Sequence, residues 1–329
     1  MYEHRLLLVG HGVISHRYVE AFGHIPNASI VGVVGRDQQR ASAYAQEKNI
    51  AYADTDLERA AAVTKATAAV ICTPNAAHGP AVLQAASLGL HVLCEKPLHI
   101  DPAVQREMIE ACRENGVKLT VSYMRRFTEH IRYIKGLIEQ GELGKLQVVD
   151  AVLKHYRPQS YYATWHGTYE MDGGGPFIQQ ASHMIDLLLW LVGGYREVLD
   201  ARLFQAAHDI ETEDHGYACV AYKNGAIGMI EASTACTGMN QEYVAISGTK
   251  GSVVLDYNGI RHFQVEGVAS APEFPEVKTE LLFRQLAGDF IRSIEQDADP
   301  FITGESAAHA VELVDAIYRK AGQVLRPEH

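Results

Sequence analysis

The first 122 residues alternate between short apolar runs and longer amphipathic segments. The apolar runs predict strands buried on both faces, and the amphipathic segments predict helices between them. Repeated strand–helix units of this kind form a parallel, doubly wound α/β sheet with right-handed crossovers. The expected strands cover residues 5–9, 29–34, 68–72, 91–94 and 118–122, and the expected helices cover residues 13–22, 40–48, 57–63, 79–88 and 102–115.

The pattern changes after residue 122, so we place domain boundaries at 1–122 and 123–329. A glycine cluster, Gly173–Gly175, precedes a long apolar stretch that predicts one helix over residues 177–192. Alternating runs then predict strands, with a hairpin turn at Asn224-Gly225. The second half is therefore expected to be an α/β domain with an open, mostly antiparallel sheet. Its strands are expected over residues 145–153, 198–204, 217–222, 227–233, 242–247 and 251–257, and its other helices over residues 130–139 and 307–321.

Composition narrows the class of protein. The chain has 329 residues with 29 Lys and Arg against 40 Asp and Glu, and its net charge of −11 argues against nucleic acid or an anionic membrane as a partner. No apolar run reaches the ~18–20 residues that cross a bilayer, and the N-terminus lacks the pattern of a signal peptide, so we predict a cytoplasmic protein. The five cysteines are odd in number and form no CxxC pair, which argues against a disulfide framework or a thiolate zinc site.

A glycine-rich turn joins the first strand to the first helix. It reads Gly10-His11-Gly12-Val13-Ile14-Ser15, a GxGxxG-like motif in the strand–turn–helix context of a Rossmann dinucleotide site. The first glycine permits the tight turn, the second lets the backbone approach a pyrophosphate, and the small Ser15 replaces the third. We predict that residues Gly10 to Ile14 bind the cofactor, and the alternative is an ordinary glycine-rich turn.

The end of the second strand bears on the choice of cofactor. NAD-specific sites often place an acid there to hold the ribose, whereas this strand ends in Gly35 and Arg36. A guanidinium can pair with a 2′-phosphate, which favours NADP over NAD. The alternative is that Arg36 is a solvated loop charge and Asp37 holds the ribose.

Two further motifs follow later strands: Cys72-Thr73-Pro74-Asn75 with His78, and Cys94-Glu95-Lys96-Pro97. Together with the glycine turn they resemble the glucose–fructose oxidoreductase, inositol dehydrogenase and MocA-like (Gfo/Idh/MocA) family. The resemblance extends over nearly the whole chain, through residues 124–127, 141–145, 182–186 and 304–305. It implies an N-terminal Rossmann domain and a C-terminal α/β domain whose sheet forms a homodimer or homotetramer.

The resemblance assigns roles near the cofactor. Lys96 matches the family lysine beside the nicotinamide, and an ammonium at the end of a parallel strand can stabilise alkoxide character on the reacting oxygen. The alternative is a surface lysine paired with Glu95. The resemblance also implies a cis peptide at Pro97. The other residues that we expect at the cofactor in these motifs are Thr73, Asn75, His78 and Glu95.

His183 matches the general base of the family, since an imidazole can take a hydroxyl proton near neutral pH. The alternative is a core histidine in an apolar helix. Many relatives carry Asp four residues before this histidine, where this chain has Gln179. An amide can orient the imidazole but cannot neutralise an imidazolium. Asp186 either holds a substrate hydroxyl or belongs to a packing network.

A polar and aromatic stretch over residues 154–168 is expected to form the substrate wall. Tyr156 and Trp165 are candidate platforms for a sugar, Arg157 could meet a phosphate or carboxylate, and Arg125 matches a substrate-side position of the family. The alternative is a loop at an oligomer interface. We predict no metal site, because the spacing specifies none. The residues considered as metal ligands were Asp172, His183, Asp186, His208 and His215.

These features predict an NAD(P)-dependent oxidoreductase of a sugar, cyclitol or related polyol, with Lys96 polarising the oxygen, His183 as acid/base and Gln179 orienting His183. Two alternatives remain. One is an NAD-dependent glycosidase-type enzyme, which oxidises a carbinol transiently and eliminates a leaving group without net redox change. The other is a non-catalytic nucleotide-binding sensor, because fold alone does not determine function.

Overall fold

The computed structural model describes residues 3–325. These residues form two compact units, one made of residues 3–124 and Lys278–Ala308, the other of Arg125–Val277 and residues 309–325. The sequence pattern placed one boundary, between residues 122 and 123, and it did not predict the return of the chain to the first unit.

A six-stranded sheet forms the centre of the first unit, and its strands are all parallel. The strand order β3-β2-β1-β4-β5-β6 confirms the predicted doubly wound fold. Leu6, Leu7 and Leu8 of the central strand are fully buried, as an apolar run between two layers of helices requires. The strands are β1 (His4–Val9), β2 (Ala28–Val34), β3 (Tyr52–Asp54), β4 (Ala68–Ile71), β5 (His91–Cys94) and β6 (Leu119–Val121).

Aspartate caps begin several helices of this unit. Asp37, Asp56 and Asp101 each accept a hydrogen bond from a backbone N–H in the first turn, which satisfies a donor that the helix itself leaves open. The helix α9, which the sequence pattern did not predict, packs on α1, where Phe283 meets Tyr18 edge to face at 5.2 Å. The helices are α1 (Ser15–Phe22), α2 (Gln38–Glu47), α3 (Leu57–Thr64), α4 (His78–Ser87), α5 (Pro102–Glu114) and α9 (Thr279–Glu295).

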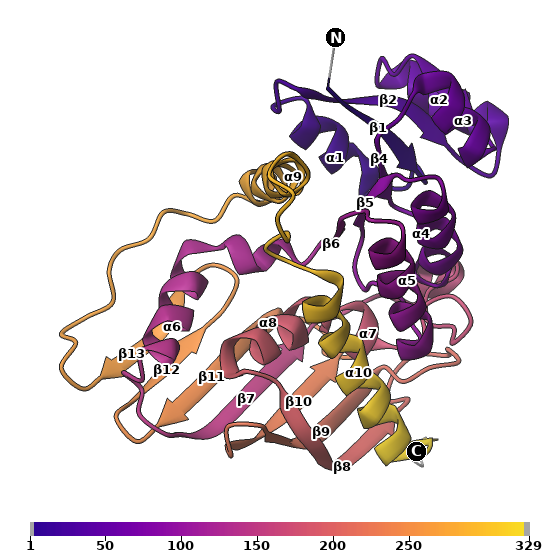
Figure 1. Cartoon of the computed structure of the whole chain (residues 1–329). Coiled ribbons are helices and arrows are strands. Elements are labelled where there is room, and N and C mark those ends of the chain that lie inside the picture. The colour runs from indigo at the N-terminus through magenta and orange to yellow at the C-terminus, as the bar shows by residue number, and fades with distance from the viewer. Residues whose placement is uncertain (1–2, 326–329) are drawn as a thin grey trace. The chain divides into compact units, whose positions relative to one another are not determined.

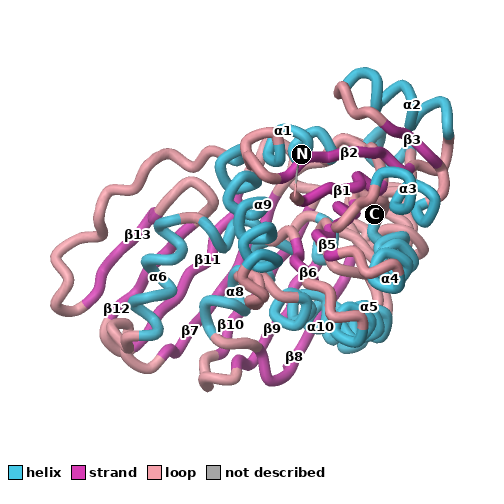
Figure 2. The backbone as a smooth tube through the Cα atoms, turned by 45° about the horizontal axis from the view of Figure 1, so that its top comes forward, coloured by secondary structure: helices cyan, strands magenta, loops and turns pink. Residues whose placement is uncertain are grey.

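The second unit is built on a mixed sheet of eight strands in the order β13-β12-β11-β7-β10-β9-β8-β14, most of which lie side by side in Figure 2. The β7–β10 and β8–β14 pairs are parallel and the other described pairs are antiparallel, so the predicted mostly antiparallel sheet is confirmed. The strands are β7 (Leu146–Lys154), β8 (Tyr195–Phe204), β9 (His215–Tyr222), β10 (Ile227–Ser233), β11 (Gln241–Gly248), β12 (Gly251–Leu255), β13 (Ile260–Val265) and β14 (Val324–Leu325).

Helices cover one face of this sheet, as Figure 1 shows for α6 (Glu129–Glu139) and α8 (Ser182–Val192). The opposite face carries exposed apolar side chains on neighbouring strands, including Val148 and Ile227, each 49% exposed. The boundary between the two units at residues 308 and 309 falls within the helix α10 (Gly304–Ala321).

The single helix predicted over residues 177–192 is wrong. The segment forms two helices, α7 (Pro176–Gln179) and α8. The N–H of Ala181 donates to the carbonyl of Pro176, five residues back, at 2.8 Å. This wide turn ends α7 and lets Ala181 start α8. Gln179 and His183 therefore lie on different helices, and their spacing of four residues is not a helical turn.

Candidate active site

The glycine turn fits a dinucleotide. Gly10 has φ +89°, and a Cβ there would come within 2.7 Å of the Cys72 backbone, so only glycine is accommodated. Among residues 3–325, apart from its chain neighbours, none would lie within 4 Å of a Cβ added at Gly12, so this side of the turn has room for a ligand. The side chain of Val13 in this turn is 89% exposed. The helix α1 starts at Ser15, whose hydroxyl and N–H both donate to the Gly12 carbonyl, and its N-terminus follows the turn directly.

The tip of β2 carries Arg36 and Asp37, the residues on which the predicted choice of cofactor depends. Arg36 is exposed. Asp37 caps α2, and its carboxylate accepts the N–H of Arg40 at 2.9 Å. Gly35 lies against the imidazole of His11, which would come within 2.7 Å of a Cβ at that position. One oxygen of the carboxylate considered as the alternative ribose ligand is thus used by α2.

His78 connects the two motif loops of the first unit. Its imidazole is fully buried, with Nδ1 at 2.9 Å from the Pro97 carbonyl and Nε2 at 2.9 Å from the Thr73 carbonyl. Burial lowers the pKa of His78 to about 4, which keeps the ring neutral. The structure therefore gives His78 a role in joining the loops, and contact with the cofactor stays a prediction. Asn75 is also buried.

Glu95 is buried at the end of β5. It accepts hydrogen bonds from the Tyr18 hydroxyl and, at 3.1 Å, from the backbone N–H of Lys96. Burial raises the pKa of Glu95 in spite of these bonds. The peptide bond between Lys96 and Pro97 is cis, which confirms the implied conformation. The Lys96 side chain is half-buried.

In the second unit, Asp186 and Arg126 form a buried ion pair. Each side chain is 2% exposed, and the guanidinium donates through Nε and one terminal nitrogen to both carboxylate oxygens. Burial raises the pKa of Asp186, an effect that Arg126 opposes. Of the two roles left open for Asp186, this geometry favours the packing network. Arg125 pairs with Glu242, and its guanidinium lies 4.9 Å from the Tyr257 ring.

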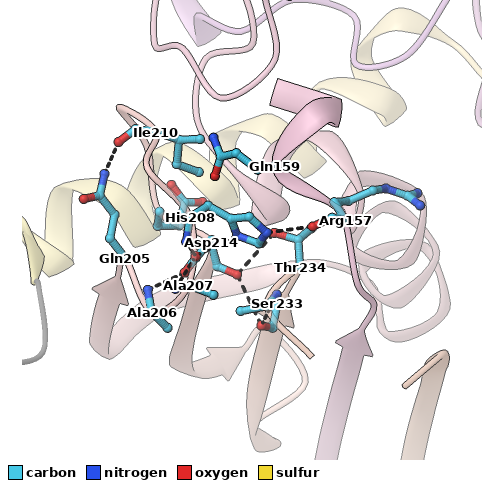
Figure 3. Close-up of polar contacts among 12 residues, drawn as sticks. Arg157, Gln159, Gln205, Ala206, Ala207, His208, Ile210, Asp214, Ser233 and Thr234 are labelled. Atoms are coloured by element: carbon cyan, nitrogen blue, oxygen red, sulfur yellow. Dashed lines mark hydrogen bonds and ion pairs between the residues drawn. The ribbon is translucent and has the colours of Figure 1, made fainter. Parts of the chain in front are cut away.

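A buried histidine–aspartate pair, His208 and Asp214, anchors the beginning of the predicted substrate wall. Nδ1 of His208 lies 2.8 Å from Asp214, and its Nε2 lies 2.7 Å from the carbonyl of Arg157. The Asp214 carboxylate also accepts three consecutive backbone N–H groups, from residues 206–208. Figure 3 shows this cluster, with the Arg157 guanidinium extending away from it. Tyr156, which is 43% exposed, immediately precedes the anchored residue.

The Gln179 side chain lies against His166 and Asp172. Its amide donates to Asp172 and lies 3.2 Å from Nδ1 of His166. His183 is half-buried in the first turn of α8. Trp165 contacts the His166 ring, with 4.0 Å between the ring centroids. The predicted action of Gln179 on His183 stays a prediction.

Sequence reasoning missed three pairings that involve titratable groups: His166 with Asp172, His208 with Asp214, and Glu213 with Tyr318. The first two join residues six apart, and this short spacing was the available signal. In the third, Glu213 is buried beside the glycine cluster and accepts the N–H of Gly175 at 3.0 Å and the Tyr318 hydroxyl at 2.7 Å.

Within residues 3–325, the group of at least three metal-type ligands that lie within reach of one another is Glu3, His4 and Glu295, and it includes none of the five candidates considered above. In the same residues, no helix is long and apolar enough to span a bilayer.

Two family models match the chain. Residues 4–123 match an oxidoreductase family with an NAD-binding Rossmann fold, and residues 131–254 match the GFO/IDH/MocA C-terminal domain. The WlbA dehydrogenase of Bordetella pertussis, solved in complex with NADH and UDP-GlcNAcA, is 30% identical with a TM-score of 0.87, over 97% of this chain and 96% of that one.

Two relatives of known name have different activities. A 2,7-anhydro-N-acetylneuraminate hydratase of Mediterraneibacter gnavus is 27% identical over 257 residues, which are 75% of this chain and 67% of that protein. The levoglucosan dehydrogenase of Pseudarthrobacter phenanthrenivorans is 27% identical over 222 residues, 59% of this chain and 56% of that protein.

Proposed function

Because this chain belongs to the Gfo/Idh/MocA oxidoreductase family, we propose that it interconverts a secondary alcohol and a ketone of a sugar, cyclitol or related polyol with a nicotinamide cofactor. The observation that carries the proposal is the glycine turn, where Gly10 closes on the Cys72 backbone and Gly12 faces open space at the start of α1. The relatives named as dehydrogenases support the reaction class.

The turn from Gly10 to Ile14 holds the pyrophosphate, largely through backbone N–H groups. When bound, the nicotinamide supplies the exchange of hydride with the carbinol carbon. We place Arg36 at the 2′-phosphate of NADP, since it is exposed at the tip of β2 and the neighbouring Asp37 is used by α2. The WlbA relative was solved with NADH, so NAD is the competing cofactor.

Lys96 and His183 carry the chemistry of the substrate. The Lys96 ammonium donates to the reacting oxygen and stabilises its negative charge, and His183 takes or returns the hydroxyl proton. Gln179 is proposed to orient His183. The substrate is proposed to contact Arg125, Tyr156 and Trp165. Asp186 is proposed to hold the Arg126 side chain in place.

A turnover assay tests the proposal. Cofactor-stripped protein is mixed with NAD or NADP and either UDP-GlcNAcA or levoglucosan, and the absorbance of the reduced nicotinamide is followed. We expect Lys96→Met and His183→Asn to lower kcat/KM by about 10²–10⁴-fold. The exposed Lys320→Met serves as the control. Cofactor binding without turnover of any polyol would support the sensor alternative instead.

A calorimetric titration with NADH and NADPH tests the cofactor assignment. We expect a preference for NADPH that disappears in Arg36→Ala and persists in Arg40→Ala, an exposed arginine on α2. A preference for NADH in the wild type would remove the 2′-phosphate role from Arg36.

The hydratase relative favours a second candidate function, the redox-neutral reaction of transient oxidation and elimination. In that case the protein would keep NAD(H) through purification, and product would form without a net change in nicotinamide absorbance.

The exposed apolar face of the second sheet supports assembly into a homodimer or homotetramer. The oligomeric state is measured by light scattering. We expect Ile227→Lys to weaken the assembly.

The cytoplasmic location of the protein stays a prediction.

A further inference from the structure

His166 is held at one side of its ring by two polar groups. Its Nδ1 lies 3.3 Å from a carboxylate oxygen of Asp172 and 3.2 Å from the amide nitrogen of Gln179. Asp172 is itself 2% exposed and accepts the backbone N–H of Gly167 at 2.7 Å. A buried carboxylate tied to the backbone and to an amide fixes the orientation of the imidazole.

Aromatic contacts fix the plane of the same ring. Tyr161 stacks on His166 with 4.3 Å between centroids and 7° between planes, and Trp165 contacts it at 4.0 Å. The Arg157 guanidinium lies 5.4 Å from the Tyr161 ring. The segment predicted as the substrate wall therefore gathers planar side chains around His166, of which Tyr161 is stacked on its ring.

The outer nitrogen of His166 distinguishes it from His208. Both nitrogens of His208 are used inside the protein, by Asp214 and by the Arg157 carbonyl. Nε2 of His166 has no hydrogen-bond partner among residues 3–325, and the side chain is 20% exposed. The same type of pair thus acts as an internal anchor in one case and leaves a nitrogen for a ligand in the other.

The partners of Nδ1 allow Nε2 to act in two ways. With the proton on Nδ1, the ring donates to Asp172 and Nε2 is an acceptor. With the proton on Nε2, Nδ1 accepts from the Gln179 amide and Nε2 is a donor. Because a sugar hydroxyl both donates and accepts, either state of His166 can bind one.

We propose that His166 is a further substrate-binding residue, whose Nε2 hydrogen-bonds a hydroxyl of the sugar-like substrate, and that Asp172 and Gln179 are its positioning residues. This inference rests on the proposed function, since it takes the substrate class from it. It assigns the Gln179 amide a contact with an imidazole other than that of His183.

The variant His166→Phe tests the inference, because it keeps a ring against Tyr161 and Trp165 but removes both nitrogens. The binding of UDP-GlcNAcA and of levoglucosan to NADH-loaded protein is measured by calorimetry, together with KM and kcat. We expect affinity for the sugar to fall about 10-fold, the worth of one hydrogen bond, with unchanged affinity for NADH. His262→Phe, on an exposed histidine of β13, is the matched control.

Asp172→Asn provides a second measurement, in which KM for the sugar and kcat are compared with those of the wild type. Loss of the carboxylate should raise KM and leave kcat and the affinity for NADH unchanged, because His166 loses the group that orients it, whereas a merely structural residue would not produce this split. The inference is overturned if wild type and His166→Phe bind the sugars equally well. If the wild type itself binds neither sugar while binding NADH, the proposed substrate class fails and the inference fails with it.

Discussion

Glu213 predicts a pH dependence of stability that one substitution should remove. Its carboxyl group is fully buried between Gly175 and Tyr318, and burial raises its pKa from 4.5 to about 7, although both hydrogen bonds act in the other direction. The folded protein keeps this proton over a range of pH in which the unfolded chain has released it. The free energy of unfolding therefore falls as the pH rises from about 4.5 through 7.

The size of the effect follows from the shift. The difference between 4.5 and about 7 corresponds to about 3 kcal/mol in the free energy of unfolding. In a unit of this size, that loss lowers Tm by about 6–12 °C. Glu213→Gln keeps the shape of the side chain and does not ionise, so its Tm should vary much less between pH 5 and pH 8.

Differential scanning calorimetry of both proteins at pH 5, 6, 7 and 8 measures the effect. The difference between the two curves isolates residue 213 from the other titrating groups, and Glu266→Gln, on an exposed side chain, is the control. We expect the Tm of Glu213→Gln to rise relative to that of the wild type as the pH rises. Parallel curves over this range would refute the reasoning that burial outweighs the two hydrogen bonds.

Two further predictions concern packing and the cofactor turn. Asp186→Ala leaves the Arg126 charge buried without its carboxylate, so the free energy of unfolding measured with guanidinium chloride should fall by about 3–5 kcal/mol. Glu110→Ala breaks an exposed pair with Arg113, and the free energy of unfolding should fall by less than about 1 kcal/mol. Equal losses in the two variants would contradict the burial argument. Gly12→Ala should fold normally, because a Cβ there has room among the described residues, but it should weaken NADH binding about 10-fold, because the Cβ occupies the approach of the pyrophosphate. Gly10→Ala should also lower Tm, because its Cβ would meet the Cys72 backbone.

Much of the first unit could be predicted because its strands carry their burial in their own sequence. A run such as Leu6–Leu8 has no polar position, which favours a strand buried on both faces. The strand β3 (Tyr52–Asp54) escaped prediction because three residues, two of them partly exposed and one a buried aspartate, are too few to show a periodicity. The break between α7 and α8 escaped for another reason. The residue pattern is that of one continuous helix, and the hydrogen bond from Ala181 to Pro176 has no signature in residue type.

The candidate site divides in a similar way. The glycine turn was predicted from local sequence, and the cis bond at Pro97 was implied by the family resemblance. Pairings between distant residues were not, because Arg126 and Asp186 are brought together by the packing of separate elements. The contacts of His166 required the path of a loop that has little regular structure, which residue pattern alone does not specify.

The position of α9 imposes an order on the making of this protein. Tyr18 of α1 packs against Phe283, so the first unit is completed by a helix that is synthesised long after the other elements of that unit. Until that helix arrives, an apolar face of α1 remains uncovered while strands β7 to β13 of the other unit are being made. A chain that stops before residue 279 would therefore lack part of the core of its N-terminal unit, although every strand of that sheet would be present.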